Sequence, residues 1–368
     1  MFMKNPETSC GILTIDLVEL ASNWHRLKNQ LKDSDCAAVI KAEAYGLGAV
    51  NAAIRLVNEG CKEFFVALID EGIYLRKALN EVSLDANIHV LSGHMLAGET
   101  FIEHNLIPVL NSLEDIVFWK KKYPQAPADI HIDTGMTRLG LSQKEIDVLQ
   151  KEPGRTNGLN ISYIISHLAC SEDPKTTMNA KQLNEFKEVL TMFPGCKASL
   201  ANSSGIFLGK NYHFNLARPG GALYGINPTP GKPNPMSQVI KLQGKILQVH
   251  EVDAPQTVGY GATYKIKKKG WIATVGVGYA DGYQRALSNN GFGFLGKFRV
   301  PLVGRVSMDL TTFDVTDVPQ HLVFPGALID LIGPMNPVDE IAKAARTNSY
   351  ELLTSLGPRF HRIFKENC

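Results

Sequence analysis

The sequence has no excess of charge of either sign. Its 38 Lys and Arg residues nearly balance its 36 Asp and Glu residues, which leaves a net charge of +2. The lysines are scattered apart from short runs, so the basic surface of a nucleic-acid-binding protein is not expected. No segment approaches the roughly 18 apolar residues of a membrane span, and the first residues lack the apolar core of a secretory signal. A cytoplasmic protein with no nucleic-acid and no membrane partner is predicted.

Cysteine is scarce and dispersed. The six cysteines include no Cys-x-x-Cys pair and no closely spaced group. Short cysteine spacings are typical of zinc sites and redox motifs, and dense cysteines are typical of small secreted domains. The thiols are therefore predicted to be buried or incidental groups in a reducing compartment, and no metal site is expected.

Alternating strand and helix patterns occupy the first two thirds of the chain. With 368 residues, 44% of them hydrophobic, the chain is long enough for one large domain and a smaller second one. Eight apolar runs typical of strands alternate with amphipathic helical patterns, and they lie at 37–42, 63–68, 87–91, 106–111, 129–134, 162–167, 197–202 and 220–225. Eight such βα repeats are what a closed (β/α)8 TIM barrel requires, so an α/β fold with this barrel is predicted. A doubly wound open sheet is the alternative.

The pattern changes after a segment rich in proline, glycine and asparagine at 227–237. Beyond it, β alternation dominates, and no helical pattern separates the next apolar runs. Two domains are therefore predicted: the barrel in residues 1–230 and a mostly β domain in residues 231–368. The first ~12 residues lead into a β-like run, GILTID, which we expect to pair with the C-terminal domain.

Unusual polar residues follow the predicted barrel strands, where barrel enzymes carry out their chemistry. The first run ends on Lys41, with Tyr45 close behind it. The later runs contribute, in chain order, Asp133, Arg138, His167, Asn202, Ser203, Arg218, Gly220 and Gly221. A serine after the seventh run and glycines at the eighth stand where barrels commonly bind a phosphate through backbone N–H groups. A lysine at the same barrel end can form a Schiff base with pyridoxal phosphate.

Each of these residues, taken alone, has a simpler explanation. A lysine that ends a strand usually extends its amine into water. A histidine such as His167 is as often structural as catalytic, and glycines such as those of YGLG are typical of turns. Tyr260 and Tyr264 are typical of cross-strand packing. The joint placement of the groups favours the functional explanation.

Seven segments together make the chain resemble the alanine racemases, a family of fold-type III pyridoxal phosphate enzymes, over essentially its whole length. In the order of the family they are AVIKAEAYGLGA, HIDTGMTRLG, ANSSG, RPGGALYGI, GYGATY, GYADGY and GRVSMD. The resemblance implies an isomerase that interconverts L-alanine and D-alanine. It also implies that the D-alanine supplies peptidoglycan synthesis for the cell wall.

The resemblance assigns two proton carriers. It implies that Lys41 binds the cofactor covalently and acts as the base on one face of the substrate α-carbon, while Tyr260 acts on the other face. Inversion of the centre needs two such opposed groups. In this family the tyrosine comes from the β domain of the other subunit, so a head-to-tail homodimer with shared active sites is implied.

The resemblance also implies the remaining site residues. Arg218 would face the pyridine nitrogen of the cofactor and keep it unprotonated, because a guanidinium stays charged at every physiological pH. The other implied cofactor contacts are Tyr45, His167, Ser203, Gly220 and Gly221, and the implied substrate contacts are Arg138 and the backbone of Met308.

Two positions depart from the best-known members of the family. Those members have a lysine that becomes carbamylated and orients the arginine, and this chain has His131 at that position. Arg138 must therefore be held by something else, such as a bound anion. Those members also bring a tyrosine to the phosphate where this chain has Pro358. Neither change affects Lys41 or Tyr260.

Two other functions stay open. One is an amino-acid racemase of broader specificity, which differs mainly in the size of the pocket around the substrate methyl group. The other is a non-catalytic pyridoxal phosphate binding protein, but such proteins resemble the barrel alone, whereas a β domain with Tyr260 is present here. A decarboxylase of the same fold type is disfavoured, because a carboxylate would be expected in place of Arg218.

Overall fold

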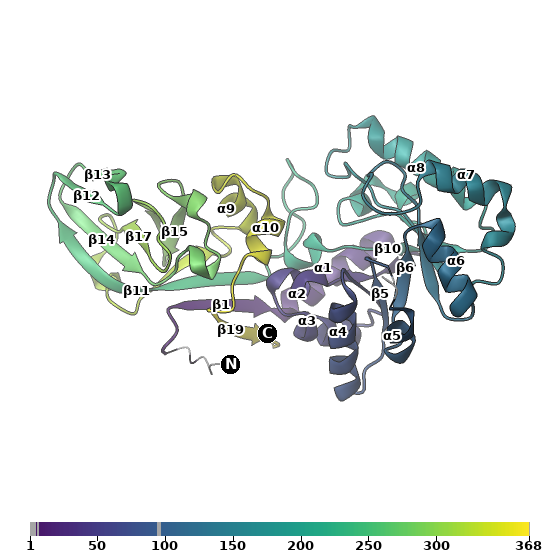
Figure 1. Cartoon of the computed structure of the whole chain (residues 1–368). Coiled ribbons are helices and arrows are strands. Elements are labelled where there is room, and N and C mark those ends of the chain that lie inside the picture. The colour runs from purple at the N-terminus through teal and green to yellow at the C-terminus, as the bar shows by residue number, and fades with distance from the viewer. Residues whose placement is uncertain (1–4, 6, 94–96, 368) are drawn as a thin grey trace. The chain divides into compact units, whose positions relative to one another are not determined.

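The chain forms two compact units (Figure 1). The computed structural model describes residues 5, 7–93 and 97–367. By position in the chain, the larger unit is Leu20–Leu223 with Asn227–Met236, and the smaller unit is Met1–Glu19, Tyr224–Ile226 and Ser237–Cys368.

The larger unit is built on a parallel sheet of nine strand segments, which neighbour one another in the order β2-β10-β9-β8-β7-β6-β5-β4-β3. These are β2 (Asp35–Cys36), β3 (Ala38–Val39), β4 (Glu63–Val66), β5 (Asn87–Val90), β6 (Ile107–Leu110), β7 (Ala128–His131), β8 (Ile161–Ile165), β9 (Lys197–Ser199) and β10 (Leu216–Ala217). The two ends of this order are separated in the chain only by Ala37, whose N–H donates to the carbonyl of Ala217. Residues 35–39 therefore border both edges of the sheet, and the predicted (β/α)8 barrel is confirmed.

Helix α1 (Leu17–Leu31) precedes the first strand of the barrel, and the other helices connect later strands. They are α2 (Lys41–Gly46), α3 (Ala49–Asn58), α4 (Ile69–Glu81), α5 (Gly98–Glu103), α6 (Leu113–Lys122), α7 (Gln143–Lys151) and α8 (Thr177–Leu190). Ser112 caps the start of helix α6, because its hydroxyl accepts the N–H of Asp115 at 3.1 Å. All four residues of β6 are buried, as expected for a parallel strand whose two faces are covered.

The eighth strand lies earlier in the chain than the sequence indicates. Residues Gly221–Tyr224, expected in a strand at 220–225, form a short 3-10 helix, and the strand is β10. A short buried apolar run does not by itself distinguish a strand from another buried segment. As a result, Arg218 directly follows the eighth strand instead of opening it.

The smaller unit is mostly β, as predicted. Its strands are β1 (Gly11–Asp16), β11 (Ile240–Val252), β12 (Gln256–Val258), β13 (Tyr264–Ile266), β14 (Gly270–Val275), β15 (Phe292–Leu295), β16 (Phe298–Pro301), β17 (Thr311–Asp314), β18 (Leu328–Ile332) and β19 (His361–Lys365), and its helices are α9 (Val338–Ala344) and α10 (Ser349–Thr354). The N-terminal strand β1 pairs antiparallel with β11 and parallel with β19. Thus the first and last strands of the described chain belong to one sheet.

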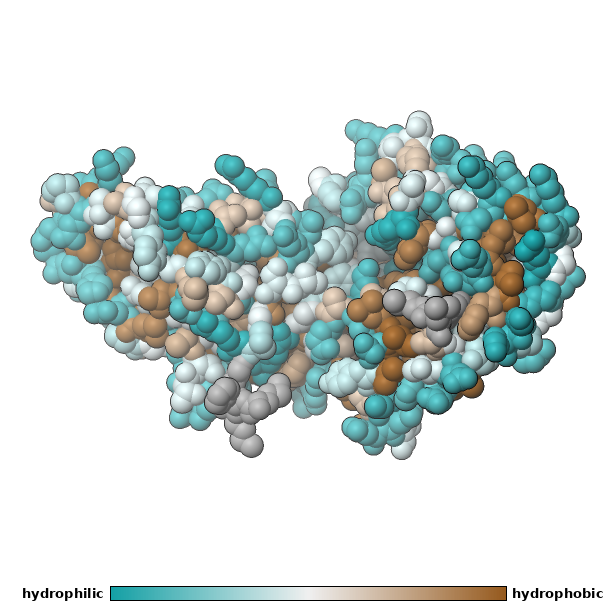
Figure 2. Space-filling view, in the orientation of Figure 1, coloured by the Kyte–Doolittle hydropathy of each residue, from teal (hydrophilic) through white to brown (hydrophobic). Residues whose placement is uncertain are grey.

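The surface is mainly polar on the face that Figure 2 shows, with apolar residues standing among the polar ones. Within the described ranges, no helix has the length and apolar character needed to cross a bilayer. Cys36 and Cys61 are buried, and none of the described cysteines forms a disulfide. Cys368 lies outside the described residues.

A charged triad is buried inside the barrel. His89 on β5 is fully buried; its Nδ1 lies 2.6 Å from Oδ2 of Asp129, and its Nε2 lies 2.8 Å from Oε2 of Glu63. Burial alone would lower the pKa of this histidine. The carboxylates of Asp129 and Glu63 together outweigh the burial and raise the pKa of His89 to about 9. His89 is therefore an imidazolium that donates two hydrogen bonds at neutral pH.

The triad makes stability depend on pH in a defined direction. An ordinary histidine in the unfolded chain has a pKa near 6.5, so the contribution of His89 is fully present below that pH and is lost as the pH rises through about 9. The difference corresponds to on the order of 3 kcal/mol of unfolding free energy. Urea unfolding followed by circular dichroism at pH about 6 and about 9.5 measures it.

Two variants identify the source of this pH dependence. His89→Gln should lower the unfolding free energy at the lower pH and remove the loss between the two pH values. His321→Gln is the matched control, because His321 is exposed, and it should leave the pH dependence unchanged. A loss that persists in His89→Gln would assign the effect to other groups.

Candidate active site

The structure brings the predicted barrel residues to one end of the barrel. Lys41 follows β3, His167 follows β8, Ser203 follows β9 and Arg218 follows β10. In a parallel barrel the carboxyl ends of all strands lie at the same end. The charges of Arg218, Arg138 and Lys41 all act on the ring of His167, which is consistent with a single cluster.

The segment directly after Lys41 has an unusual backbone. Four residues in a row, from Ala42 to Tyr45, are left-handed, with φ between 51° and 58°. Such a conformation costs roughly 1–2 kcal/mol for each residue with a side chain. Gly46 and Gly48 continue it with φ of 83° and 107°, which explains the glycines of the YGLG sequence. This turn links Lys41 to helix α3 and therefore fixes the direction of the chain between them.

Lys41 has an amine that loses its proton more easily than an ordinary lysine. Burial and, to a smaller extent, the charge of Arg138 lower the pKa of Lys41, while the carboxylate of Glu71 acts in the opposite direction. A lysine with a lowered pKa presents more of the neutral amine, which is the form that attacks a carbonyl carbon.

Arg218 is buried, and its guanidinium is held by the hydroxyl of Ser199 and the carbonyl of Ser166. It also lies over the ring of Phe65, with 5.7 Å between the guanidinium carbon and the ring centroid. Burial lowers the pKa of Arg218 to about 10, against the opposing charge of Asp129. The guanidinium is therefore still charged at neutral pH and fixed in orientation.

Ser203, Gly220 and Tyr45 form a compact polar cradle. The hydroxyl of Ser203 accepts the N–H of Gly220 at 3.0 Å and that of Ala222 at 3.2 Å. A Cβ on Gly220 would come within 2.1 Å of the hydroxyl of Tyr45, so only glycine allows this approach. Gly221 follows at once and begins the 3-10 helix. Hydroxyl and backbone N–H donors on glycine-rich loops are typical of phosphate sites.

The loop that carries Arg138 is folded around one carboxylate. Oδ1 of Asp133 accepts the N–H groups of Gly135 at 2.9 Å, Met136 at 2.8 Å and Thr137 at 3.1 Å. Burial would raise the pKa of Asp133, but these hydrogen bonds outweigh it and lower the pKa. Arg138 itself is exposed at the end of this loop.

His131 and His167 are both neutral at physiological pH. Burial, followed by the charge of Arg218, lowers the pKa of His167 to about 3 and that of His131 to about 4. Nδ1 of His131 lies 2.9 Å from Oδ1 of Asn111. The amide nitrogen of Asn111 donates to the carbonyls of Leu91 and Val109, each at 3.0 Å. Its oxygen therefore faces the ring, and Nδ1 of His131 carries the proton.

Tyr260 and Met308 belong to the smaller unit, and both are exposed. The side chain of Tyr260 is 72% exposed and that of Met308 is 55% exposed. Tyr260 stands in a tight turn between two glycines with positive φ, Gly259 and Gly261.

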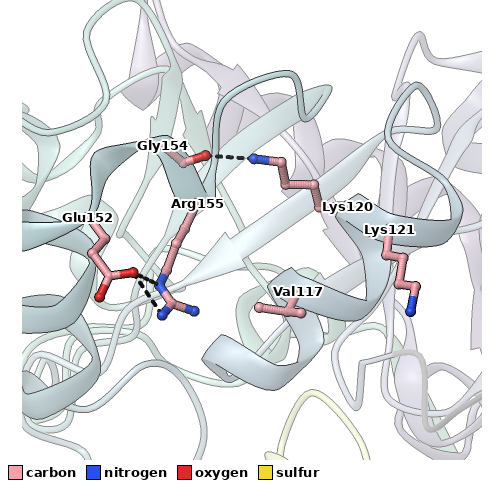
Figure 3. A pocket seen from close by; sticks show the side chains of 6 residues that line it. All are labelled: Val117, Lys120, Lys121, Glu152, Gly154 and Arg155. Atoms are coloured by element: carbon pink, nitrogen blue, oxygen red, sulfur yellow. Dashed lines mark hydrogen bonds and ion pairs between the residues drawn. The ribbon is translucent and has the colours of Figure 1, made fainter.

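A surface hollow of about 670 Å³ is lined by Val117, Lys120, Lys121, Glu152, Gly154 and Arg155 (Figure 3). Lys120 donates to the carbonyl of Gly154 at 2.6 Å, and Arg155 pairs with Glu152 at 2.8 Å. The helices of a βα barrel start at the carboxyl ends of the strands and run back, and this hollow lies where α6 and α7 end. It is therefore at the barrel end opposite Lys41 and is not the candidate site.

Both parts of the chain match models of known families. Residues 15–228 match "Alanine racemase, N-terminal domain", and residues 239–364 match "Alanine racemase, C-terminal domain". The chain is 49% identical over 368 residues to the alanine racemase of Rhodospirillum rubrum, with 98% of each chain covered. It is 43% identical over 380 residues to that of Rhizobium meliloti, with 98% of this chain and 99% of the relative covered. A solved structure of the alanine racemase from Bartonella henselae with covalently bound pyridoxal phosphate is similar at a TM-score of 0.91, with 40% identity and coverage of 97% of this chain and 99% of that one.

Proposed function

The chain belongs to the alanine racemase family, and we propose that the residues gathered at its barrel end carry out the reaction of that family. The enzyme is an isomerase that depends on pyridoxal phosphate and interconverts L-alanine and D-alanine. The observation that carries the residue assignments is the convergence of Lys41, the cradle of Ser203 and Gly220, and Arg218 at one barrel end.

The donors at this barrel end fit the cofactor. Tyr45, Ser203, Gly220 and Gly221 would hold its phosphate, because the hydroxyls of Tyr45 and Ser203 both approach Gly220, where a Cβ has no room. The Ser203 hydroxyl accepts the N–H of Gly220 and has its own proton to donate. His167 would lie beside the ring of the cofactor. Pyridoxal phosphate, when bound, supplies an electron-withdrawing ring that makes the α-proton of alanine acidic.

Lys41 would serve both as the covalent anchor and as one of the two bases. Its lowered pKa supports both roles, since attack on the aldehyde and removal of a proton each require the neutral amine. As a base, the amine of Lys41 would remove or return the proton on one face of the α-carbon.

Tyr260 would carry the proton on the opposite face. Its exposure on the smaller unit supports a site shared between two subunits, with the tyrosine of one subunit completing the barrel end of the other. We therefore propose a homodimer in which the predicted domains divide the work: residues 1–230 hold the cofactor, and residues 231–368 contribute the second base.

Arg218, Arg138 and Met308 would complete the site. The guanidinium of Arg218, still charged at neutral pH, would keep the pyridine nitrogen unprotonated and so limit side reactions. Arg138, presented by the loop around Asp133, and the backbone of Met308 would bind the substrate. The neutral ring of His131 would stand in place of the family's carbamylated lysine.

We further propose that the D-alanine formed enters the peptidoglycan of the cell wall. The cytoplasmic location stays a prediction from the sequence. The barrel-only alternative, a non-catalytic cofactor-binding protein, is disfavoured by the C-terminal match over residues 239–364.

Chiral chromatography of L-alanine incubated with the protein and pyridoxal phosphate tests the function. D-alanine should accumulate until the two enantiomers are present in equal amounts, because enantiomers have the same free energy in solution. A yellow protein that leaves alanine unchanged would mean that the substrate or the second base is wrong. Comparable rates with L-serine and larger amino acids would favour the broader racemase instead.

A further inference from the structure

Glu71 connects two neighbouring loops at the barrel end. It lies in the first turn of α4, and its Oε2 accepts the N–H of Ala67 at 2.7 Å and that of Leu68 at 3.0 Å. Its other oxygen, Oε1, accepts the N–H of Ala42 at 2.6 Å. Ala67 and Leu68 precede α4, whereas Ala42 directly follows Lys41.

Helix capping explains only one half of this arrangement. A carboxylate in the first turn of a helix commonly accepts N–H groups that the helix leaves unpaired, and the bonds to Ala67 and Leu68 are of this kind. The bond to Ala42 adds nothing to α4. It reaches another strand–helix connection, and it is the shortest of the three.

The hydrogen bond from Ala42 to Glu71 stabilises an unfavourable part of the backbone. Ala42 is the first of the four left-handed residues that follow Lys41, a conformation that side chains disfavour. The N–H that Glu71 accepts belongs to the peptide bond between Lys41 and Ala42. Fixing this peptide plane fixes the backbone of Lys41 and, through it, the direction in which the lysine side chain leaves.

The same carboxylate influences the charge of the lysine. Burial and the charge of Arg138 lower the pKa of Lys41, and Glu71 raises it. The ring of His167, which also senses Lys41, is neutral at physiological pH because burial and nearby cations hold its pKa at about 3. Among these groups, Glu71 is the one that favours the protonated lysine.

We propose that Glu71 is a positioning residue for Lys41, which holds the left-handed turn in place and thereby sets the direction and the reactivity of the lysine amine. The inference rests on the proposed role of Lys41 as the covalent anchor and base. Glu71 itself takes no part in proton transfer.

Glu71→Gln separates this role from helix capping. An amide has one accepting oxygen, so it can serve Ala67 and Leu68 or it can serve Ala42, but not both sides. The charge is lost as well. We expect thermal unfolding close to that of the wild type, a fall in kcat of about tenfold, and a KM for alanine that changes less than about twofold.

The reactivity of the Lys41 amine can be measured independently of racemisation. In the full chain freed of cofactor, acetylation of Lys41 by acetic anhydride is followed against pH by peptide mass spectrometry. The midpoint should move to lower pH in Glu71→Gln, because a charge that favours the ammonium is gone. Asp70→Asn is the matched control: it removes a charge from the same turn of α4, its side chain is exposed, and no change is expected.

Glu71→Asp separates the effect of the Glu71 hydrogen bonds from the effect of its negative charge. It keeps the carboxylate but is one methylene shorter, so it cannot reach both loops. The acetylation midpoint should stay near the wild-type value while kcat still falls.

The outcomes distinguish this inference from the proposed function. A wild-type protein with no cofactor bound to Lys41 would overturn the role of Lys41, and with it the present inference. In a second outcome, the wild type carries the cofactor on Lys41 while Glu71→Gln shows the same acetylation midpoint and the same kcat as the wild type. That result would overturn only the role of Glu71. A change confined to thermal stability would reduce Glu71 to a helix cap and overturn the inference as well.

Discussion

Replacing Tyr260 with phenylalanine should lower the rate of racemisation by roughly 10²–10⁴-fold, while the protein keeps its yellow colour. The change removes one hydroxyl from a side chain that is exposed in its own chain, so folding should not depend on it, and the cofactor should stay attached to Lys41. Without this hydroxyl, the proton can still leave and return on the face of Lys41, but it cannot be delivered to the opposite face.

Proton exchange in heavy water tests the two faces separately. In Tyr260→Phe, Lys41 should still exchange the α-proton of one alanine enantiomer with solvent deuterium, whereas the other enantiomer should exchange hardly at all. Proton NMR of each enantiomer measures this asymmetry. Tyr264→Phe is the matched control in the same segment, with a half-buried side chain on β13, and should leave both exchange rates unchanged. Full racemase activity in Tyr260→Phe would refute the two-base assignment.

Replacing Lys41 with alanine should abolish the covalent attachment of the cofactor and lower racemisation by roughly 10³-fold or more. The residue is proposed to serve as both anchor and base, so both functions are lost together. Borohydride reduction followed by peptide mass spectrometry should show the cofactor on the peptide of Lys41 in the wild type and on no peptide in the variant.

Lys62→Ala is the control for the loss of a lysine near a barrel strand. Lys62 is exposed, and its removal should change neither the colour nor the rate. A reduced cofactor–peptide adduct that persists in Lys41→Ala would place the anchor on another lysine and would withdraw the assignment of the site.

The two variants together test the shared site. In a dimer whose sites combine the barrel of one subunit with Tyr260 of the other, mixing Lys41→Ala with Tyr260→Phe creates hybrid dimers. Each hybrid has one intact site and one site that lacks both groups. Random exchange of subunits should therefore restore about a quarter of the wild-type activity. No recovery in demonstrably mixed dimers would place both residues of each site in the same chain.

The barrel was predictable because its strands and helices have different hydrophobic periods. Runs such as 63–68 and 106–111 are short and apolar, and the segments between them are amphipathic over helical lengths. The eighth strand was misplaced because Gly221–Tyr224 is as apolar as a strand, and hydrophobicity alone carries no information on backbone geometry. The left-handed turn at Ala42–Tyr45 was not predicted, since alanine, glutamate and tyrosine all disfavour this conformation.

The residues that hold the site in place were harder to predict than the site itself. Ser166 and Ser199 bind Arg218 from segments that are 52 and 19 residues away in the chain, and no local pattern links them. Asn111 ends the fourth predicted run, so its position carried a signal, but its contact with His131 depends on the order of strands in the barrel. Polar residues at every strand end therefore merit examination, including those that match no motif.

The presence of His131 in place of a lysine has a consequence for the dependence of the site on carbon dioxide. A lysine carbamate forms only by taking up carbon dioxide, so an enzyme that orients its arginine in that way depends on the bicarbonate around it. His131 has no amine to carbamylate, and its ring is fixed by Asn111. With His131 at that position, the proposed substrate end of this site should assemble equally well at any concentration of carbon dioxide.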